Sequence, residues 1–154
     1  MNNKKVIDKF RKLIGDRNVL TKEWNKLPYS KGWRYGAGNT LAVLKPDKLS
    51  DIWRILQICI EHDIIVIMQA ANTGLTGGST PFGDDYDRPV LVVNTMRINN
   101  IHIINQGSQI VGLTGSTLYD LENKLKPYGR EPHSIIGSTS IGASIIGGIC
   151  NNAG

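Results

Sequence analysis

One long stretch of this sequence, residues 68–83, is made almost entirely of small, uncharged side chains. It reads MQAANTGLTGGSTPFG and contains no lysine, arginine, aspartate or glutamate. Small side chains let a ligand approach the backbone, and glycines permit turns that direct several N–H groups at one point. The composition therefore indicates a phosphate-binding loop, and the alternative is a long surface connection.

A second glycine-rich stretch follows at residues 130–154, where isoleucines and glycines are interleaved. Gly137, Gly142 and Gly147 recur every five residues. Each glycine in a helix or strand costs about 0.5–1 kcal/mol relative to alanine, so we expect irregular backbone here. Two such surfaces suit a diphosphate held by N–H dipoles and a flat ring system lying against glycine and isoleucine. A dinucleotide such as FAD fits that description.

Most other chemistries lack their motifs. The sequence has no G-x-G-x-x-G, no G-K-[ST], no G-x-S-x-G and no H-E-x-x-H, which excludes the usual Rossmann, P-loop, hydrolase and zinc-protease signatures. The histidines and cysteines have no metal-ligand spacing, and we expect no metal. Asp84, Asp85 and Asp87 could hold a cation or form a solvated turn. His133, beside the second glycine-rich stretch, is a candidate catalytic residue.

Composition and charge describe an ordinary globular chain with one uneven feature. It has 154 residues, 40% hydrophobic and 20% charged, enough for one domain with a core. Residues 1–48 hold 12 Lys or Arg against 4 Asp or Glu, whereas residues 49–154 hold 6 against 9. The basic third could face an acidic membrane, nucleic acid or plain solvent. No nucleic-acid-binding motif is present, and no apolar run reaches the roughly 20 residues of a membrane span.

The elements that would position the first stretch form a strand–helix–strand unit. Apolar spacing predicts helices over residues 6–14 and 49–62 and strands over 41–44, 64–68 and 90–94. Continuous apolar runs predict strands buried on both faces of a parallel sheet. The second helix is expected to begin at a cap, Ser50 or Asp47. Its expected buried face consists of Ile52, Ile55, Leu56, Cys59 and Ile60.

The second half has a different, antiparallel pattern. Residues 101–104 and 109–113 predict a hairpin, and residues 118–126 predict a helix that Thr117 and Asp120 cap. Residues 21–40 show no period. Their aromatic and basic segment, KGWRYG, could stack bases or pack as an irregular arm against the domain.

Several segments, taken together and in order, resemble the bacterial respiratory D-lactate dehydrogenases, which depend on FAD and reduce quinone. The similarity extends from about residue 32 to residue 154, whereas the first 30 residues resemble the family only in general character and not in specific motifs. The segments are MQAANTGLT (68–76), GSTP (78–81), DYDR (85–88), LKP (125–127), GREPHS (129–134), IGAS (141–144) and IGGICNN (146–152).

The resemblance implies an α+β fold of the PCMH/vanillyl-alcohol-oxidase FAD-binding type, with FAD between two α+β subdomains. We expect a basic N-terminal helix and arm over residues 1–35, a first subdomain over 36–98 and the incomplete start of a second over 99–154. The resemblance also implies which residues contact FAD, and no catalytic base can be assigned. The expected cofactor-binding residues are Ala70, Ala71, Asn72, Thr73, Gly74, Gly78, Ser79, Gly137, Ser144 and Gly154.

The resemblance further implies oxidation of D-lactate to pyruvate by a peripheral protein on the cytoplasmic side of the inner membrane, with quinone as electron acceptor and no nucleic-acid partner. The chain stops directly after an apolar, glycine-rich run, so we expect it to be an inactive N-terminal fragment, cytosolic if alone. Two alternatives stay open: a non-catalytic module that binds a nucleotide or a partner, and the same fold acting on another 2-hydroxy acid.

Overall fold

The computed structural model describes residues 3–84, 86–133 and 135–153. Four strands form its larger sheet, in the order β1-β2-β4-β3. Strand β4 pairs in parallel with both β2 and β3, whereas β1 pairs antiparallel with β2. The strands are β1 (Val19–Leu20), β2 (Ala42–Leu44), β3 (Ile65–Gln69) and β4 (Val90–Asn94). The predicted strand–helix–strand unit is confirmed, with β4 inserted between its two strands.

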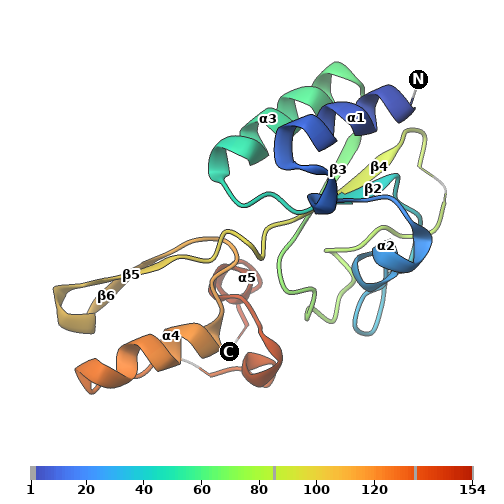
Figure 1. Ribbon diagram of the computed structural model, residues 1–154. Helices are drawn as coiled ribbons and strands as arrows, with labels where there is room; N and C mark the ends of the chain where they lie inside the picture. The colour runs from blue at the N-terminus through green and yellow to red at the C-terminus, as the bar shows by residue number, and fades with distance from the viewer. Residues whose placement is uncertain (1–2, 85, 134, 154) are drawn as a thin grey trace.

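Helices α1 (Asn3–Ile14) and α3 (Leu49–Glu61) lie together on one face of this sheet (Figure 1). The predicted first helix is confirmed, and Gly15 ends it with a φ of 84° while its N–H donates to the Arg11 carbonyl. Phe10 is fully buried, in one core cluster with the sheet residues Leu44 and Leu91. The 3-10 turn η1 (Asp16–Asn18) then leads into β1.

The predicted helix over residues 49–62 is confirmed, but part of its predicted buried face is wrong. Ile55 and Cys59 are buried, and burial raises the pKa of the Cys59 thiol to about 11. Leu56 and Ile60 are 37% and 81% exposed and share an outer stripe with Leu49 and Trp53. The buried face of α3 is narrower than its apolar pattern predicts, because α1 and one sheet face cover only one side of this helix.

The predicted caps of α3 are also wrong. The N-cap is Lys48, which makes no side-chain cap bond. Asp47 instead pairs with Arg97, whose Nη2 lies 3.0 Å from the carboxylate. The Asp47 side chain, which local spacing predicts as the helix cap, therefore forms a long-range ion pair instead.

Strand β3 departs from its predicted burial on both faces. Its side chains are mostly half-buried, and Met68 is 45% exposed. The cause is position: β3 lies at the edge of the sheet. The central strand β4, by contrast, is buried throughout as predicted.

Residues 21–40, predicted to be an irregular arm, contain a helix, α2 (Glu23–Ser30). Lys26 hides its periodicity, because this charged residue occupies the buried position. Its ammonium donates to the Thr40 carbonyl at 2.6 Å and pairs with Glu23 at 2.7 Å. Pro28 inside the helix further weakens the sequence signal.

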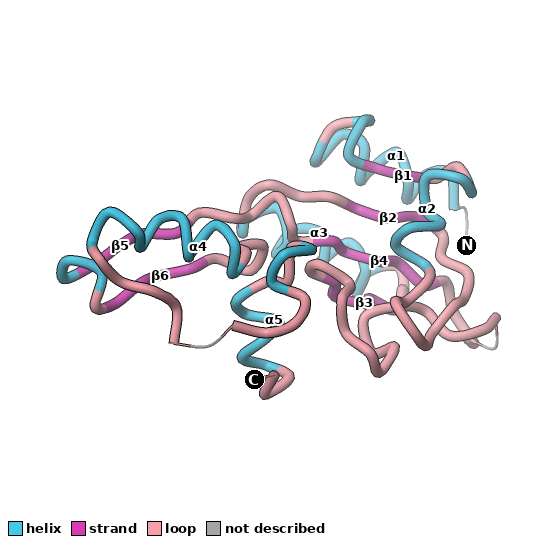
Figure 2. Tube along the Cα trace, turned by 90° about the horizontal axis from the view of Figure 1, so that it is seen from below, coloured by secondary structure: helices cyan, strands magenta, loops and turns pink. Residues whose placement is uncertain are grey.

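A second unit extends to one side of the sheet (Figure 2). The predicted hairpin is confirmed as an antiparallel pair, and Thr117 caps the helix that follows by accepting from the Asp120 N–H at 3.0 Å. This unit has its own core around Leu121 and Ile145. Its elements are β5 (Ile101–Ile104), η2 (Asn105–Gly107), β6 (Gln109–Gly112), α4 (Leu118–Leu125), η3 (Lys126–Tyr128), η4 (Thr139–Ile141) and α5 (Ile145–Cys150).

The short helix α5 contradicts the expectation of irregular backbone throughout residues 130–154. Ser144 caps it by accepting from the Gly147 N–H at 3.2 Å. A Cβ on Gly147 would lie 2.6 Å from the Ser144 hydroxyl oxygen, so any other residue here would require that side chain to shift. A cap and one packed turn offset the cost of two glycines here. The α+β fold class is confirmed, while the predicted boundaries at residues 35/36 and 98/99 stay predictions.

Candidate functional site

A cavity of about 800 Å³ separates the two glycine-rich stretches. One wall is the loop that leaves the carboxyl end of β3, where open α/β sheets bind ligands. The other wall comprises residues from 135–138 and 143–153, which include most of α5. Its lining residues are Met68, Gln69, Ala70, Ala71, Asn72, Thr73, Gly74, Leu75, Thr76, Gly78, Ser79, Thr95, Thr114, Ile135, Ile136, Gly137, Ser138, Ala143, Ser144, Ile146, Gly147, Gly148, Cys150, Asn151 and Ala153.

The structure brings the predicted cofactor-binding residues together around this cavity. The seven from residues 70–79 line the first wall, while Gly137 and Ser144 line the second. The tenth, Gly154, lies outside the described residues. Their individual contacts with FAD stay predictions, but their convergence from two distant segments is a property of the fold.

The described lining of the cavity contains no charged side chain. An anionic group there would be held by backbone N–H dipoles and hydroxyls rather than by a cation. The volume lies within the usual range for cofactor sites, about 300–1,000 Å³. The arrangement can bind and orient a diphosphate and a flat ring, and it offers no carboxylate or imidazole for proton transfer.

Two features of the cavity fit a bound dinucleotide. A Cβ added to Gly74, Gly137 or Gly148 would meet nothing within 4 Å, so bare backbone faces open space there. The Thr114 hydroxyl oxygen is buried and has no hydrogen-bond partner within the described part of the chain. A polar group of a ligand in the cavity would complete the bonding of this hydroxyl, as a water molecule would.

Sequence reasoning missed the cavity residues that come from neither glycine-rich stretch. Thr95 follows β4 and Thr114 follows β6, so both reach the cavity from strand ends. The sequence signal for Thr114 is its place before Gly115, whose Cβ would lie 2.5 Å from the Thr95 carbonyl. That close approach brings the two threonines into one site.

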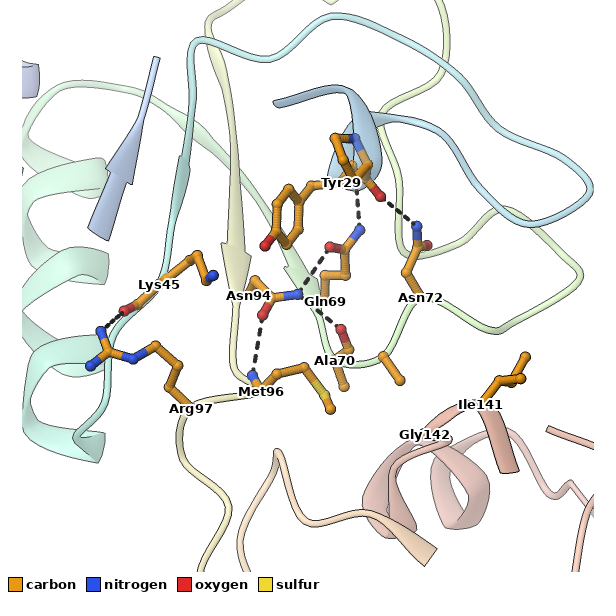
Figure 3. A pocket seen from close by; sticks show the side chains of 12 residues that line it. Tyr29, Lys45, Gln69, Ala70, Asn72, Asn94, Met96, Arg97, Ile141 and Gly142 are labelled. Carbon is orange, nitrogen blue, oxygen red and sulfur yellow. Dashed lines mark hydrogen bonds between the residues drawn. The ribbon is translucent and has the colours of Figure 1, made fainter. Parts of the chain in front are cut away.

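A smaller pocket of about 290 Å³ adjoins the cavity (Figure 3) and shares four lining residues with it, Gln69, Ala70, Ala71 and Asn72. Asn94 crosslinks the strand ends at this point. Its amide nitrogen donates to the Gln69 side-chain oxygen at 3.1 Å and to the Ala70 carbonyl at 2.9 Å. The Lys45 ammonium lies 5.6 Å from the centre of the Tyr29 ring and supplies positive charge beside the loop.

The remaining candidates that the structure describes do not join the site. His133 is exposed and lines neither the cavity nor the smaller pocket. Within the described ranges, no group of three or more His, Cys, Asp or Glu could hold a metal ion. Asp85 lies outside those ranges, and Asp84 accepts from the Asn39 amide at 2.6 Å.

The family model for the FAD binding domain matches residues 40–154, which include both walls of the cavity. The chain belongs to this FAD-binding family. FAD is therefore the cofactor of this domain, as predicted. Three curated relatives are each named quinone-dependent D-lactate dehydrogenase. The chain is 56% identical over 154 residues to the one from Haemophilus influenzae and 50% identical over 153 residues to the one from Escherichia coli.

These matches cover the whole of this chain or nearly so, yet only 27% of either relative. The chain thus spans about a quarter of the length of the curated relatives it matches. A D-2-hydroxyglutarate dehydrogenase from Danio rerio is 27% identical over 150 residues, which cover 94% of this chain and 26% of the relative.

Solved structures show the same fold at low sequence identity. p-Cresol methylhydroxylase superposes with a TM-score of 0.76 at 21% identity, covering 95% of this chain and 28% of that one. A 4-ethylphenol oxidase from Gulosibacter chungangensis gives a TM-score of 0.69 at 21% identity, covering 94% and 28%. The predicted PCMH-type fold is confirmed.

Proposed function

We propose that this chain is the FAD-holding part of a flavoprotein that oxidises D-lactate to pyruvate and passes the electrons to quinone. The observation that carries the proposal is 56% identity over the entire chain to a relative named for that activity. The two glycine-rich walls and their shared cavity supply the cofactor site that such a reaction needs.

The residues of this chain bind and orient rather than react. The loop at residues 70–79 offers its backbone N–H groups to the diphosphate, and residues 135–138 and 143–148 present isoleucine and glycine to the cavity, which suits a flat ring. FAD, when bound, would supply a two-electron acceptor for the electrons released as the C2 alcohol becomes a ketone. No described cavity residue carries a carboxylate, an imidazole or an amine, so the base is expected elsewhere in the protein.

A second candidate is oxidation of a different 2-hydroxy acid. It is supported by the similarity to the D-2-hydroxyglutarate dehydrogenase, which spans almost the whole chain. The lower identity, 27% against 56%, favours D-lactate. A module that only binds FAD is the third outcome, because binding is all that the described cavity residues themselves provide.

We also propose that the protein works at the cytoplasmic face of the inner membrane. A quinone acceptor dissolves in lipid, and the net balance of +8 over residues 1–48, from 12 basic and 4 acidic side chains, suits an anionic surface. Among the described helices, none has the length and apolar character to span a bilayer. Peripheral contact is the form proposed, because the basic residues 1–48 suit an anionic surface.

Steady-state reduction of a quinone analogue by the whole protein tests the proposal, with D-lactate, L-lactate and D-2-hydroxyglutarate compared at equal concentration. We expect turnover with D-lactate at least about tenfold above either competitor. Residues 1–154 alone are expected to give none, because their cavity offers no base. A preference for D-2-hydroxyglutarate would support the second candidate, and a flavin-loaded protein inactive with all three would support a binding module.

A further inference from the structure

Residues 28–39, called the collar, lie along the outside of the loop formed by residues 68–83, called the phosphate loop. The collar turns back on itself, with a bridge between Lys31 and Ala37 and a hydrogen bond from the Gly32 N–H to the Gly36 carbonyl at 2.7 Å. It lies N-terminal to the segment that the FAD-binding family model matches, which begins at residue 40.

Two side chains tie the beginning of the loop to this collar. The Gln69 amide donates to the Tyr29 carbonyl at 2.9 Å and to the Ser79 carbonyl at 2.8 Å. The Asn72 amide nitrogen donates to the Lys31 carbonyl at 2.9 Å. The bonds to the Tyr29 and Lys31 carbonyls depend on the path of the collar backbone, because both carbonyls belong to the collar.

The far end of the loop is held by backbone contacts. The Gly83 N–H donates to the Ala37 carbonyl at 2.8 Å, and Gly38 forms a bridge with Gly83. Between the two ends, Gly36 has a φ of 87° and lies so close to the loop that a Cβ would be 2.2 Å from the Thr80 hydroxyl oxygen and 3.1 Å from the Gly77 Cα. The collar therefore touches the loop at its start, middle and end.

Both polar atoms of the Asn72 side chain make hydrogen bonds within the protein. Its amide nitrogen serves Lys31, and its amide oxygen accepts from the Ser79 hydroxyl at 2.9 Å. Its φ of 56° places it in the left-handed region, which asparagine tolerates better than most residues. The residue fixes a sharp turn and links it to both the collar and the opposite side of the loop.

We propose that the collar is part of the cofactor site, and that Asn72 and Ser79 act on FAD as positioning residues. The collar holds the loop so that its N–H groups converge on the diphosphate, while the Asn72 and Ser79 side chains stabilise that shape instead of contacting the cofactor. The proposal rests on the FAD-binding role assigned above. It adds to the site a segment outside the matched family domain.

Gly36→Ala in the whole protein tests the collar, because Gly36 lines neither the cavity nor the smaller pocket. We expect FAD to bind at least about tenfold more weakly, since the loop must move away from the new methyl group. Gly129→Ala is the matched control: its φ is also positive, at 64°, but a Cβ there meets nothing within 4 Å. Equal FAD affinity in the two variants would overturn the collar's role.

Asn72→Gly and Ser79→Ala form a double-mutant cycle that keeps the test valid if Gly36→Ala fails to fold. Glycine accepts the φ of Asn72, so only the side-chain bonds are lost. We expect each change to weaken FAD binding about fivefold to tenfold and the double variant to be no weaker than Asn72→Gly alone. Additive losses would show that Ser79 contacts FAD directly and would overturn the positioning role.

Two further measurements distinguish a failure of the collar's role from a failure of FAD binding itself. A purely structural role would lower the thermal midpoint of the apoprotein and leave the FAD dissociation constant unchanged, which would also overturn the proposal. Wild-type protein that holds no FAD would refute the assigned cofactor itself. Wild-type and variants that bind FAD equally well would refute only the collar.

Discussion

Replacing Ala71 by glutamate is expected to weaken FAD binding about a hundredfold relative to Ala71→Gln. Ala71 lies on the loop wall and is half-buried. The described lining of the large cavity has no charged side chain, whereas Lys45 and Arg97 line the smaller pocket that Ala71 also borders. Charge repulsion between an added carboxylate and the diphosphate is strong where water is partly excluded. Titration of the apoprotein with FAD, followed by quenching of flavin fluorescence, gives both dissociation constants.

Glutamine is the control because it has the size of glutamate without the charge. Both variants crowd the cavity equally, so their difference isolates the electrostatic effect on the diphosphate. Added salt should narrow the difference. Equal affinities of Ala71→Glu and Ala71→Gln would mean that the diphosphate lies away from this loop.

Phe10→Ala is expected to lower the free energy of unfolding by about 3–5 kcal/mol. Phe10 is fully buried where α1 packs on the sheet, in one cluster with Ile55 and Leu91. Removing the ring leaves a cavity that the rigid β4 cannot fill. Chemical denaturation of the apoprotein, followed by far-UV circular dichroism, measures the change.

Phe10→Leu is the matched variant, because leucine retains most of the buried apolar volume. Its loss should be less than half that of Phe10→Ala. Helix α1 precedes the segment matched by the family model. A loss below about 1 kcal/mol for Phe10→Ala would show that α1 is a loosely attached addition rather than part of this core.

Local chemistry explains the parts of the fold that the sequence predicts well. The hairpin β5–β6, the Thr117 cap and the buried strand β4 each follow from residues close together in the chain. The predictions of burial and capping are wrong where segments distant in the sequence determine which side chains are covered. Leu56 and Ile60 match the apolar pattern of α3 but face outward, because only α1 and the sheet cover the helix.

The same distinction applies to the site. Glycine and small residues predict both walls from composition, and the structure places them across one cavity. Composition could not predict which side chains support the walls from behind. The family resemblance predicts that Asn72 contacts FAD, which stays a prediction, and the structure adds that its amide is bonded to the collar and to Ser79. The sequence does not predict helix α2, because a buried lysine, Lys26, and a proline, Pro28, disrupt its helical period. The collar continues from the end of this helix and shows no period of its own.

Hydrogen–deuterium exchange of the backbone, with and without FAD, tests most directly whether the two glycine-rich walls enclose the cofactor. We expect FAD to slow exchange at residues 70–79 and 137–148 together, because both segments line the cavity. The hairpin β5–β6 should be unchanged, since its residues line no part of that cavity. Protection of one wall alone, or of neither, would contradict the two-walled site.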